Sequence, residues 1–156
     1  MQKLLITFGT RPLAIRLSKL MQAKYEVLHA TSEEVPSVLK DKYLNIPTGT
    51  NPIFSHEVLK LALDLDVQMI LPLGATEVQA ISESIQLFEE YGIRIICPDK
   101  NELLAIDVLF EPTKELPLSV VLDRVDLISG QPVASIVNGL GVISDSGEDF
   151  VLAVLK

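Results

Sequence analysis

The chain has 156 residues, of which 48% are hydrophobic and 22% are charged, a composition typical of a folded globular protein and not of a disordered one. Thirteen Lys and Arg residues against 21 Asp and Glu residues give a formal net charge of −8, which disfavours nucleic acid and anionic membrane surfaces as partners. The single cysteine, Cys97, cannot form an intramolecular disulfide. No signal-peptide-like leader opens the sequence, and no apolar run reaches the length of a membrane helix, so we expect a cytoplasmic location.

The first two thirds of the sequence predict β-strands that alternate with α-helices. Apolar runs typical of strands occupy residues 4–8, 25–29, 67–71 and 93–97, and apolar residues at helical spacing occupy 14–21, 58–65, 76–91 and 101–106. The strand runs are continuous instead of alternating, as is usual for parallel strands that are buried on both faces. We therefore expect an α/β fold, a Rossmann-like parallel sheet with flanking helices.

Local signals mark the ends of these helices. Asn51 followed by Pro52 fits an N-cap and a first-turn proline for the second helix. Asp99 or Asn101 is expected to cap the last, short helix. Gly92 suits the left-handed backbone position that follows the end of a helix.

Two stretches depart from this alternation. Between residues 30 and 50 the pattern weakens, and we expect a connection with some extended chain and a short helical turn at 37–42. After residue 108 the sequence becomes β-rich, with strand-like runs at 118–122, 125–128, 133–137 and 150–155 that are separated by turn residues. We interpret this last part as an antiparallel meander.

The change in pattern divides the chain into a Rossmann-like domain at residues 1–108 and a β-rich antiparallel C-terminal extension at residues 109–156. Because about 45 residues rarely bury a core of their own, we expect the extension to pack on the first domain or on a second subunit. The acidic residues Asp145, Glu148 and Asp149 are interpreted as a solvated turn and not as a Mg²⁺ site.

The first candidate ligand contacts lie between the first predicted strand and the first predicted helix, at Gly9, Thr10 and Arg11. Glycine permits a close approach at a strand end, and the free N–H groups of the following helix favour an anion. Ligands of open α/β sheets bind at the carboxyl ends of the strands, so these residues are placed to contact one. The alternative is that Gly9 only makes a turn and that Arg11 is a solvated charge.

A second set of candidate contacts follows the third predicted strand, at Gly74, Thr76 and Glu77. This segment again joins a strand to a helix, so it should lie on the same edge of the sheet. The alternative is that Thr76 caps the helix and that Glu77 complements the helix dipole. No dinucleotide fingerprint and no Gly-Lys-Ser or Gly-Lys-Thr motif occurs, which argues against NAD and P-loop nucleotide binding.

The remaining reactive residue types are better explained as structural residues. His29 and His56 are the only histidines, and neither stands in a spacing typical of metal ligands. Cys97 lies in an apolar strand, where a free cysteine usually behaves as a small hydrophobic residue. We therefore expect no metal ion, no cofactor and no catalytic residue.

Four segments stand together in a characteristic order and spacing, namely Leu4-Leu5-Ile6-Thr7 and residues 67–74, 91–98 and 101–107. They resemble the N-terminal, or preATP-grasp, domain of ATP-grasp enzymes, above all of the carbamoyl-phosphate-synthase-like ligases. The resemblance covers about residues 1–108. It implies a contribution to an acceptor-substrate pocket, which by position would be formed by Gly9, Thr10, Arg11, Gly74, Thr76 and Glu77.

The chain departs from that family in two ways. The family commonly has Asp-Lys where this chain has Asp107-Val108. The ATP-grasp module itself, with its nucleotide-binding lysines and its acidic Mg²⁺ ligands, is absent from the sequence. We therefore expect no ATP-dependent ligation by this chain alone.

A second, shorter resemblance covers residues 8–15. The segment Phe8-Gly9-Thr10-Arg11-Pro12-Leu13-Ala14-Ile15 is similar to the opening of UDP-N-acetylglucosamine 2-epimerases. Enzymes of that family place their substrate between two Rossmann-like domains, which 156 residues cannot hold. Binding of a sugar nucleotide is the further alternative that this resemblance implies.

The sequence as a whole favours a non-catalytic binding module. Its expected partner is a small ligand of carboxylate, amino acid or nucleotide type, or an ATP-grasp protein that the chain would serve as a subunit. We expect no nucleic acid or membrane partner, and we expect a homo-oligomer. The competing hypothesis is a structural homodimer joined through an exposed edge of the β-rich extension, with a vestigial ligand site.

Overall fold

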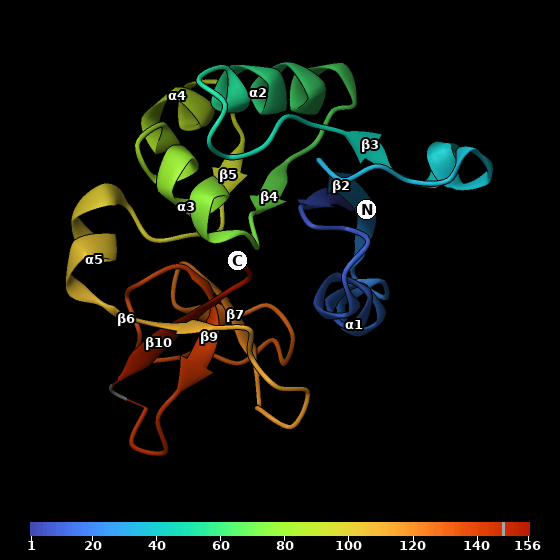
Figure 1. The fold of residues 1–156 in the computed structure, drawn as a ribbon. Helices are drawn as coiled ribbons and strands as arrows, with labels where there is room; N and C mark the ends of the chain where they lie inside the picture. The colour runs from blue at the N-terminus through green and yellow to red at the C-terminus, as the bar shows by residue number, and fades with distance from the viewer. Residues whose placement is uncertain (148) are drawn as a thin grey trace.

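Two five-stranded β-sheets form the framework of the chain, which the computed structural model describes at residues 1–147 and 149–156 (Figure 1). Glu148, one of the acidic residues of the predicted solvated turn, lies outside the described residues. Within the described parts of the chain, no helix combines the length and the apolar character needed to cross a lipid bilayer.

The first sheet is the parallel sheet that the sequence predicts. Its strands are β1 (Gln2–Ile6), β2 (Tyr25–Thr31), β3 (Leu44–Asn45), β4 (Met69–Leu71) and β5 (Arg94–Ile95). They lie in the order β3-β2-β1-β4-β5, and every neighbouring pair is parallel. The direction of strand order reverses between β1 and β4, so the switch point of this Rossmann-like sheet lies between these two strands.

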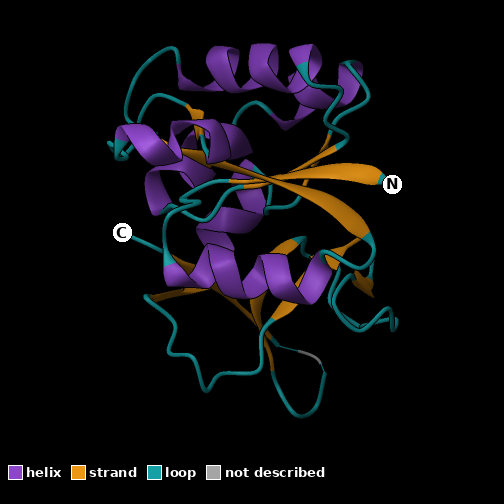
Figure 2. Cartoon of the chain, turned by 90° about the vertical axis from the view of Figure 1, so that its right-hand side faces the viewer, coloured by secondary structure: helices purple, strands orange, loops and turns teal. Residues whose placement is uncertain are grey.

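Helices cover both faces of the parallel sheet (Figure 2). One face carries α1 (Pro12–Met21), and the other carries α2 (Phe54–Asp64), α3 (Ala75–Ser82) and α4 (Ile85–Glu90). Each helix buries its apolar residues against the sheet, as the helical spacing of these residues in the sequence requires. The predicted α/β fold class is therefore confirmed.

One predicted helix is divided in two. The segment expected as a single helix at 76–91 is interrupted after Ser82, and α4 begins at Ile85. The Ser82 hydroxyl donates a hydrogen bond to the Gln79 carbonyl at 2.8 Å, and such bonds compete with the regular helical pattern. At the far end, Gly92 has a φ of 77°, which confirms the predicted left-handed residue after the helix.

The two predicted N-caps have different outcomes. Asp99 caps α5 (Lys100–Ala105), because its carboxylate accepts a hydrogen bond from the Glu102 N–H at 2.8 Å. Asn51 does not cap α2, and that prediction is wrong. The Asn51 side chain accepts a hydrogen bond from the Ile53 N–H at 3.0 Å in a turn that precedes the helix.

The stretch between β2 and α2 contains one element more than expected. A 3-10 turn, η1 (Ser37–Lys42), lies where the sequence predicts a helical turn. The two-residue strand β3 then pairs with β2 and adds a fifth strand to the sheet. A strand of this length leaves no apolar run, so the sequence carried no periodic signal for it.

The second sheet is formed by the C-terminal third of the chain. Its strands are β6 (Asp107–Phe110), β7 (Ser119–Leu122), β8 (Val125–Asp126), β9 (Gly139–Ile143) and β10 (Phe150–Val154), in the order β6-β10-β9-β7-β8. Its pairs are antiparallel except for β6 and β10, which are parallel. The β-rich antiparallel extension is present, but the strand order is not that of a meander, because β9 pairs with β7 and leaves β8 at an edge.

Residues 133–137, which were predicted to form a strand, do not form one. The strand of this region is instead β9, which begins two residues later. Two of its five residues are glycines, which weaken the strand signal in the sequence. A Cβ on Gly141 would overlap the Val151 carbonyl oxygen and the Phe150 ring. Glycine is therefore needed here so that the neighbouring strand and its aromatic ring can approach.

Strand β10 joins the two sheets through its side chains. Leu152 and Val154 belong to the hydrophobic cluster shared with α2, α3 and α4, whereas Ala153 and Leu155 belong to the cluster shared with α1. This division follows from the alternation of side chains along a strand. Both clusters therefore contain residues of both sheets.

The substitution Leu152→Ala should lower the unfolding temperature of both sheets together. Leu152 is 2% exposed, and truncation of a buried leucine costs about 2–5 kcal/mol of the free energy of unfolding. Thermal and urea unfolding followed by circular dichroism would show one transition, shifted downward. Ile136→Ala, at a side chain that is 64% exposed, is the control and should change the free energy by less than about 0.5 kcal/mol. Two separate transitions, only one of them shifted, would contradict this prediction.

Candidate functional site

The switch point between β1 and β4 is filled by the side chain of Phe8. This residue follows β1 with a φ of 50°, in the left-handed region that bulky residues rarely adopt. Its ring lies so close to Gly74, after β4, that a Cβ on Gly74 would overlap it. Glycine at this position thus admits a ring of the protein, where the sequence predicted the approach of a ligand.

The carboxyl group of Glu77 lies buried next to this contact. Its Oε1 atom accepts hydrogen bonds from the Thr7 hydroxyl at 2.5 Å and from the Gly74 N–H at 3.1 Å. The Thr7 oxygen in turn accepts a hydrogen bond from the Leu73 N–H at 2.8 Å. Burial raises the pKa of Glu77 to about 7, against the opposing effect of the hydrogen bonds from Thr7 and Gly74. The carboxyl group therefore connects the ends of β1 and β4 inside the protein.

The C-terminal end of the chain occupies the first turn of α3. The Leu155 N–H donates to the Leu73 carbonyl, and the Leu155 carbonyl accepts from the Ala75 N–H, both at 2.8 Å. Gly49 lies against the same turn, since a Cβ on Gly49 would be 2.5 Å from the Glu77 nitrogen. The protein itself therefore engages or covers N–H groups of this helix that an anionic ligand would need.

Thr10 and Arg11 converge on Glu33. The Thr10 hydroxyl and the Arg11 Nε both donate to Glu33 Oε1, at 2.9 and 3.0 Å. The Arg11 guanidinium also lies over the Phe8 ring, 5.2 Å from its centroid. The hydrogen bond with Glu33 raises the pKa of Arg11, and the hydrogen bonds from Arg11 and Thr10 lower the pKa of Glu33. Arg11 is therefore paired with a carboxylate of the protein, and Thr10 shares the same partner.

The two other predicted contact residues lie apart from each other. Gly9 is buried against β2, where a Cβ would be 2.6 Å from the Cβ of His29. Thr76 is exposed on α3 and borders an open groove. The structure thus brings all six predicted residues into contact with groups of the protein, and Thr76, which packs against Gly49, also borders the groove.

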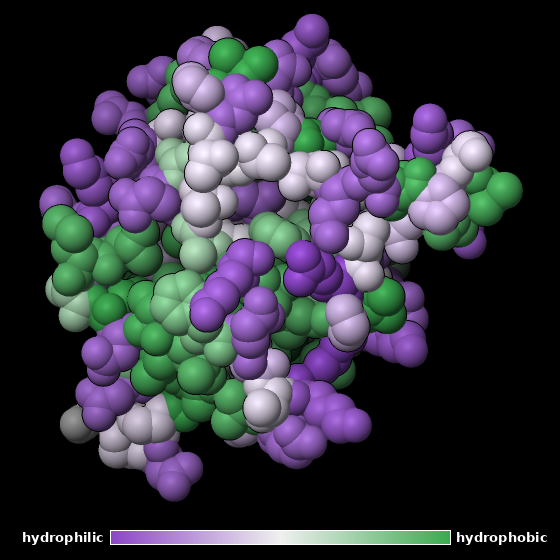
Figure 3. Space-filling view, in the orientation of Figure 1, coloured by the Kyte–Doolittle hydropathy of each residue, from purple (hydrophilic) through white to green (hydrophobic). Residues whose placement is uncertain are grey.

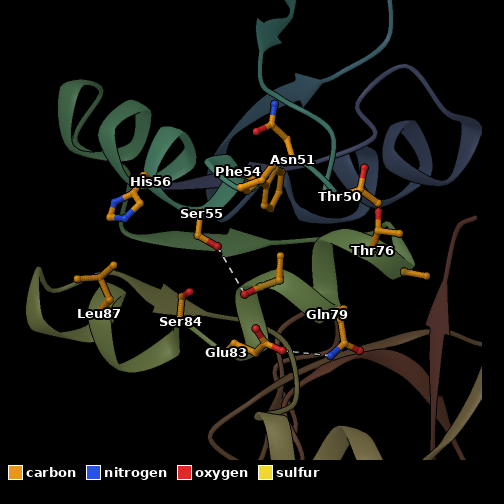
Figure 4. A pocket seen from close by; sticks show the side chains of 14 residues that line it. Thr50, Asn51, Phe54, Ser55, His56, Thr76, Gln79, Glu83, Ser84 and Leu87 are labelled. Carbon is orange, nitrogen blue, oxygen red and sulfur yellow. Dashed lines mark hydrogen bonds between the residues drawn. The ribbon is translucent and has the colours of Figure 1, made fainter.

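The groove bordered by Thr76 has a volume of ≈ 730 Å³ and lies between the segment 49–56 and the helices α3 and α4 (Figure 4). Its polar lining comprises Thr50, Asn51, Ser55, His56, Thr76, Gln79, Glu83 and Ser84. Its apolar lining comprises Pro52, Phe54, Ala75, Ala80 and Leu87. A concave apolar surface with several polar groups around it has the character of a small-molecule site.

Two long hydrogen bonds run along and across this groove. The Ser55 hydroxyl donates to the Ala80 carbonyl at 3.5 Å and so links α2 to α3 (Figure 4). The Gln79 amide donates to Glu83 Oε1 at 3.4 Å along one wall. Both distances are at the long end for hydrogen bonds, so these polar groups are weakly engaged and retain capacity for a ligand.

Apart from Thr76, the groove residues were missed in the sequence because they form no motif. Ser55 and His56 stand at the start of α2, whereas Gln79 is on α3 and Glu83 follows its last residue, so their proximity depends on helix packing. The available signal was the polar side of each amphipathic helix. Every exposed helix surface carries that signal, so it could not single out these residues.

The other candidates for chemistry lie outside the groove or are unreactive. Cys97 is buried in the core, as predicted. This burial raises the pKa of its thiol to about 12. His29 is half-buried in β2, and burial lowers its pKa. Among the residues that the structure describes, no three or more His, Cys, Asp or Glu side chains lie together in a way that could hold a metal ion.

No protein-family model and no curated protein matches the chain. The resemblance to preATP-grasp domains therefore stays a prediction.

The substitution Glu77→Gln should remove a pH dependence from the stability of the protein. Folding raises the pKa of Glu77 from 4.5 to about 7. The protonated carboxyl group therefore contributes fully to the free energy of unfolding below pH 4.5, and this contribution is lost as the pH rises through 7. The amide can accept the same hydrogen bonds, so above pH 7 the variant should be more stable than the wild type, by up to about 3 kcal/mol.

Thermal unfolding from pH 4.5 to pH 8 measures the difference between the two proteins. All other titrating groups are present in both proteins and cancel in that difference. Glu90→Gln, at an exposed site on α4, is the control and should run parallel to the wild type. A Glu77→Gln curve that is also parallel to the wild type would contradict the prediction.

Proposed function

We propose that this chain is a non-catalytic module that binds a small polar ligand in the groove between the segment 49–56 and the helices α3 and α4. The observation that carries the proposal is the groove itself. Its volume of ≈ 730 Å³ falls within the range of roughly 300–1,000 Å³ usual for small-molecule sites. It also combines weakly engaged polar groups with an apolar surface.

The state of the switch point supports this location over the edge predicted from the sequence. Phe8 fills the crevice, Leu155 engages the first turn of α3, and Thr10 and Arg11 are held by Glu33. A ligand at the switch point would have to displace these contacts. The groove requires no such rearrangement, because it is open on the outside of α3.

The groove chemistry supports binding more than catalysis. Ser55 and His56 are adjacent on α2, and neighbouring helix residues do not face each other. The Ser55 hydroxyl donates its long, 3.5 Å hydrogen bond to the Ala80 carbonyl and not to His56. The groups with strongly raised pKa values, Glu77 and Cys97, are buried elsewhere in the protein.

A thermal-shift screen with a groove-filling variant tests the proposal. The library would contain sugars, polyols, amines, amino acids, carboxylates and nucleotides. A ligand at 100 times its Kd adds about 2.7 kcal/mol to the free energy of unfolding, which is a measurable shift. The substitution Gln79→Trp places an indole in the groove and should abolish the shift, because Gln79 is exposed there.

Two controls accompany the screen. Gln86→Trp makes the same exchange at an exposed position of α4 outside the groove lining, and Arg11→Ala removes a side chain at the filled switch point. Both variants should retain the ligand-induced shift. Loss of the shift in Arg11→Ala with retention in Gln79→Trp would place the ligand at the switch point instead. If no compound of the library raised the unfolding temperature, the result would count against a binding module.

A structural homodimer is the second candidate, and the edge strand β6 favours it. Val108 and Phe110 on this strand are 37% and 47% exposed although both are apolar. Hydrophobic residues gather on this side of the molecule, over the region of α5 and β6 in Figure 1 (Figure 3). In an antiparallel pair of two β6 strands centred on Val108, Ile106 would lie opposite Phe110 of the second copy, which makes one face of the pair apolar.

Sedimentation velocity at several protein concentrations tests this second candidate. If β6 pairs with a second copy, the wild type should shift from monomer to dimer as the concentration rises. Val108→Lys should then keep the protein monomeric, because a charge on an edge strand opposes pairing. Ile136→Lys, at an exposed position away from β6, should leave the dimer intact. A wild type that stays monomeric throughout would exclude the homodimer.

A further inference from the structure

The side chains that line the groove limit the charge of what it can hold. Among the lining residues that the structure describes, Glu83 is the one carboxylate, and no lysine or arginine is present. The net charge of the chain, −8, has the same sign. A phosphate or carboxylate ligand would therefore enter the groove without a lysine or arginine to pair with, and against the net charge of the protein.

The N-terminus of α3 is partly engaged by groups of the protein itself. The first turns of α2 and α3 both border the groove, and in α3 the Ala75 N–H donates to the Leu155 carbonyl. The Gly74 N–H donates to Glu77, and Gly49 packs on the Glu77 nitrogen. Part of the positive charge of this helix end is thus directed at groups of the protein.

The polar groups that remain suit hydroxyl and amine groups. Thr50, Ser55, Thr76 and Ser84 present hydroxyls, which both donate and accept hydrogen bonds, and Gln79 presents an amide. Ser84 precedes α4 and makes no side-chain capping bond. Figure 4 shows these side chains on the two walls of the groove, with Ser55 on the α2 side and Gln79 and Ser84 on the α3 and α4 side.

The carboxylate of Glu83 has unused capacity for a cation. It is exposed, and it accepts one hydrogen bond, from Gln79 at 3.4 Å. An ionised carboxylate accepts up to about four hydrogen bonds, and those from a cationic donor are the strongest. An ammonium group in the groove could therefore pair with Glu83 while hydroxyl groups bond to the neighbouring side chains.

From these observations we propose that the groove selects small hydroxyl-rich molecules that are uncharged or carry an ammonium group, with Glu83 as the residue that prefers the ammonium form. This inference rests on the proposed function and narrows its ligand class. It departs from the carboxylate and nucleotide ligands expected from the sequence. Within the groove, the C–H face of a sugar ring could pack against Ala80 and Leu87.

Three probes with one sugar skeleton test the inference: glucosamine, glucose and glucose 6-phosphate. Binding to the full chain would be followed by chemical shifts of backbone amides in the segment 49–56 and in α3 and α4. Glucosamine should bind most tightly, and glucose 6-phosphate should bind at least five- to tenfold more weakly than glucosamine. The preference of the protein for glucosamine over glucose should decrease as salt is added, because Glu83 is exposed and salt screens its charge.

A matched pair of variants assigns the preference to Glu83. Glu83→Gln should reduce the preference for glucosamine over glucose to near unity, whereas Glu90→Gln, at an exposed glutamate outside the groove lining, should retain it. Glucose binding should change little in either variant. A preference for glucosamine that survives Glu83→Gln would overturn the inference.

The failure of the inference and the failure of the proposed function give different results. Glucose 6-phosphate binding as tightly as glucosamine would overturn the inference, and the proposed function would stand if Gln79→Trp abolished that binding. No binding of any probe at millimolar concentration would also overturn the inference. In that case the broader ligand screen decides the proposed function separately.

Discussion

Two backbone hydrogen bonds at Leu155 hold the parallel sheet and the C-terminal sheet in one arrangement. They join the residue after β10 to Leu73 and Ala75, on either side of the turn between β4 and α3. The side chains of β10 then alternate between the two hydrophobic clusters, so that each cluster contains residues of both sheets. This attachment places the end of the chain at the carboxyl edge of the parallel sheet, where ligands of Rossmann-like folds usually bind.

The closed switch point follows from that attachment. With Leu155 at the first turn of α3 and the Phe8 ring against Gly74, the crevice holds side chains and backbone of the protein. Glycine permits close approach of any group, and a sequence does not show whether that group is a ligand or another part of the chain. Our functional proposal rests instead on the open groove beside α3, which lies away from the switch point.

The distribution of ionisable groups supports the binding role that we propose. Glu77 and Cys97 have strongly raised pKa values because they are buried, and each is enclosed in the protein core. Glu83 in the groove is exposed and weakly engaged. The groups with strongly shifted pKa values thus lie apart from the groove, whereas catalytic sites usually have such groups in the ligand-binding cleft.

The sequence by itself determined the local structure of the first two thirds of the chain. Continuous apolar runs predicted the main parallel strands, helical spacing predicted the helices, and Asp99 and Gly92 marked two helix ends, because these features depend on residues close together in the chain. Strands β3, β6 and β9 were missed. The two-residue strand β3 and the glycine-rich strand β9 are stabilised by their neighbours and not by their own propensity, and β6 is a short strand at the edge of its sheet, paired with β10. The strand order of the second sheet, the closed switch point and the groove were decided by tertiary structure alone. Each of them depends on which distant segments pack together, and the position of Leu155 beside the turn between β4 and α3 has no signature in the residues that form it.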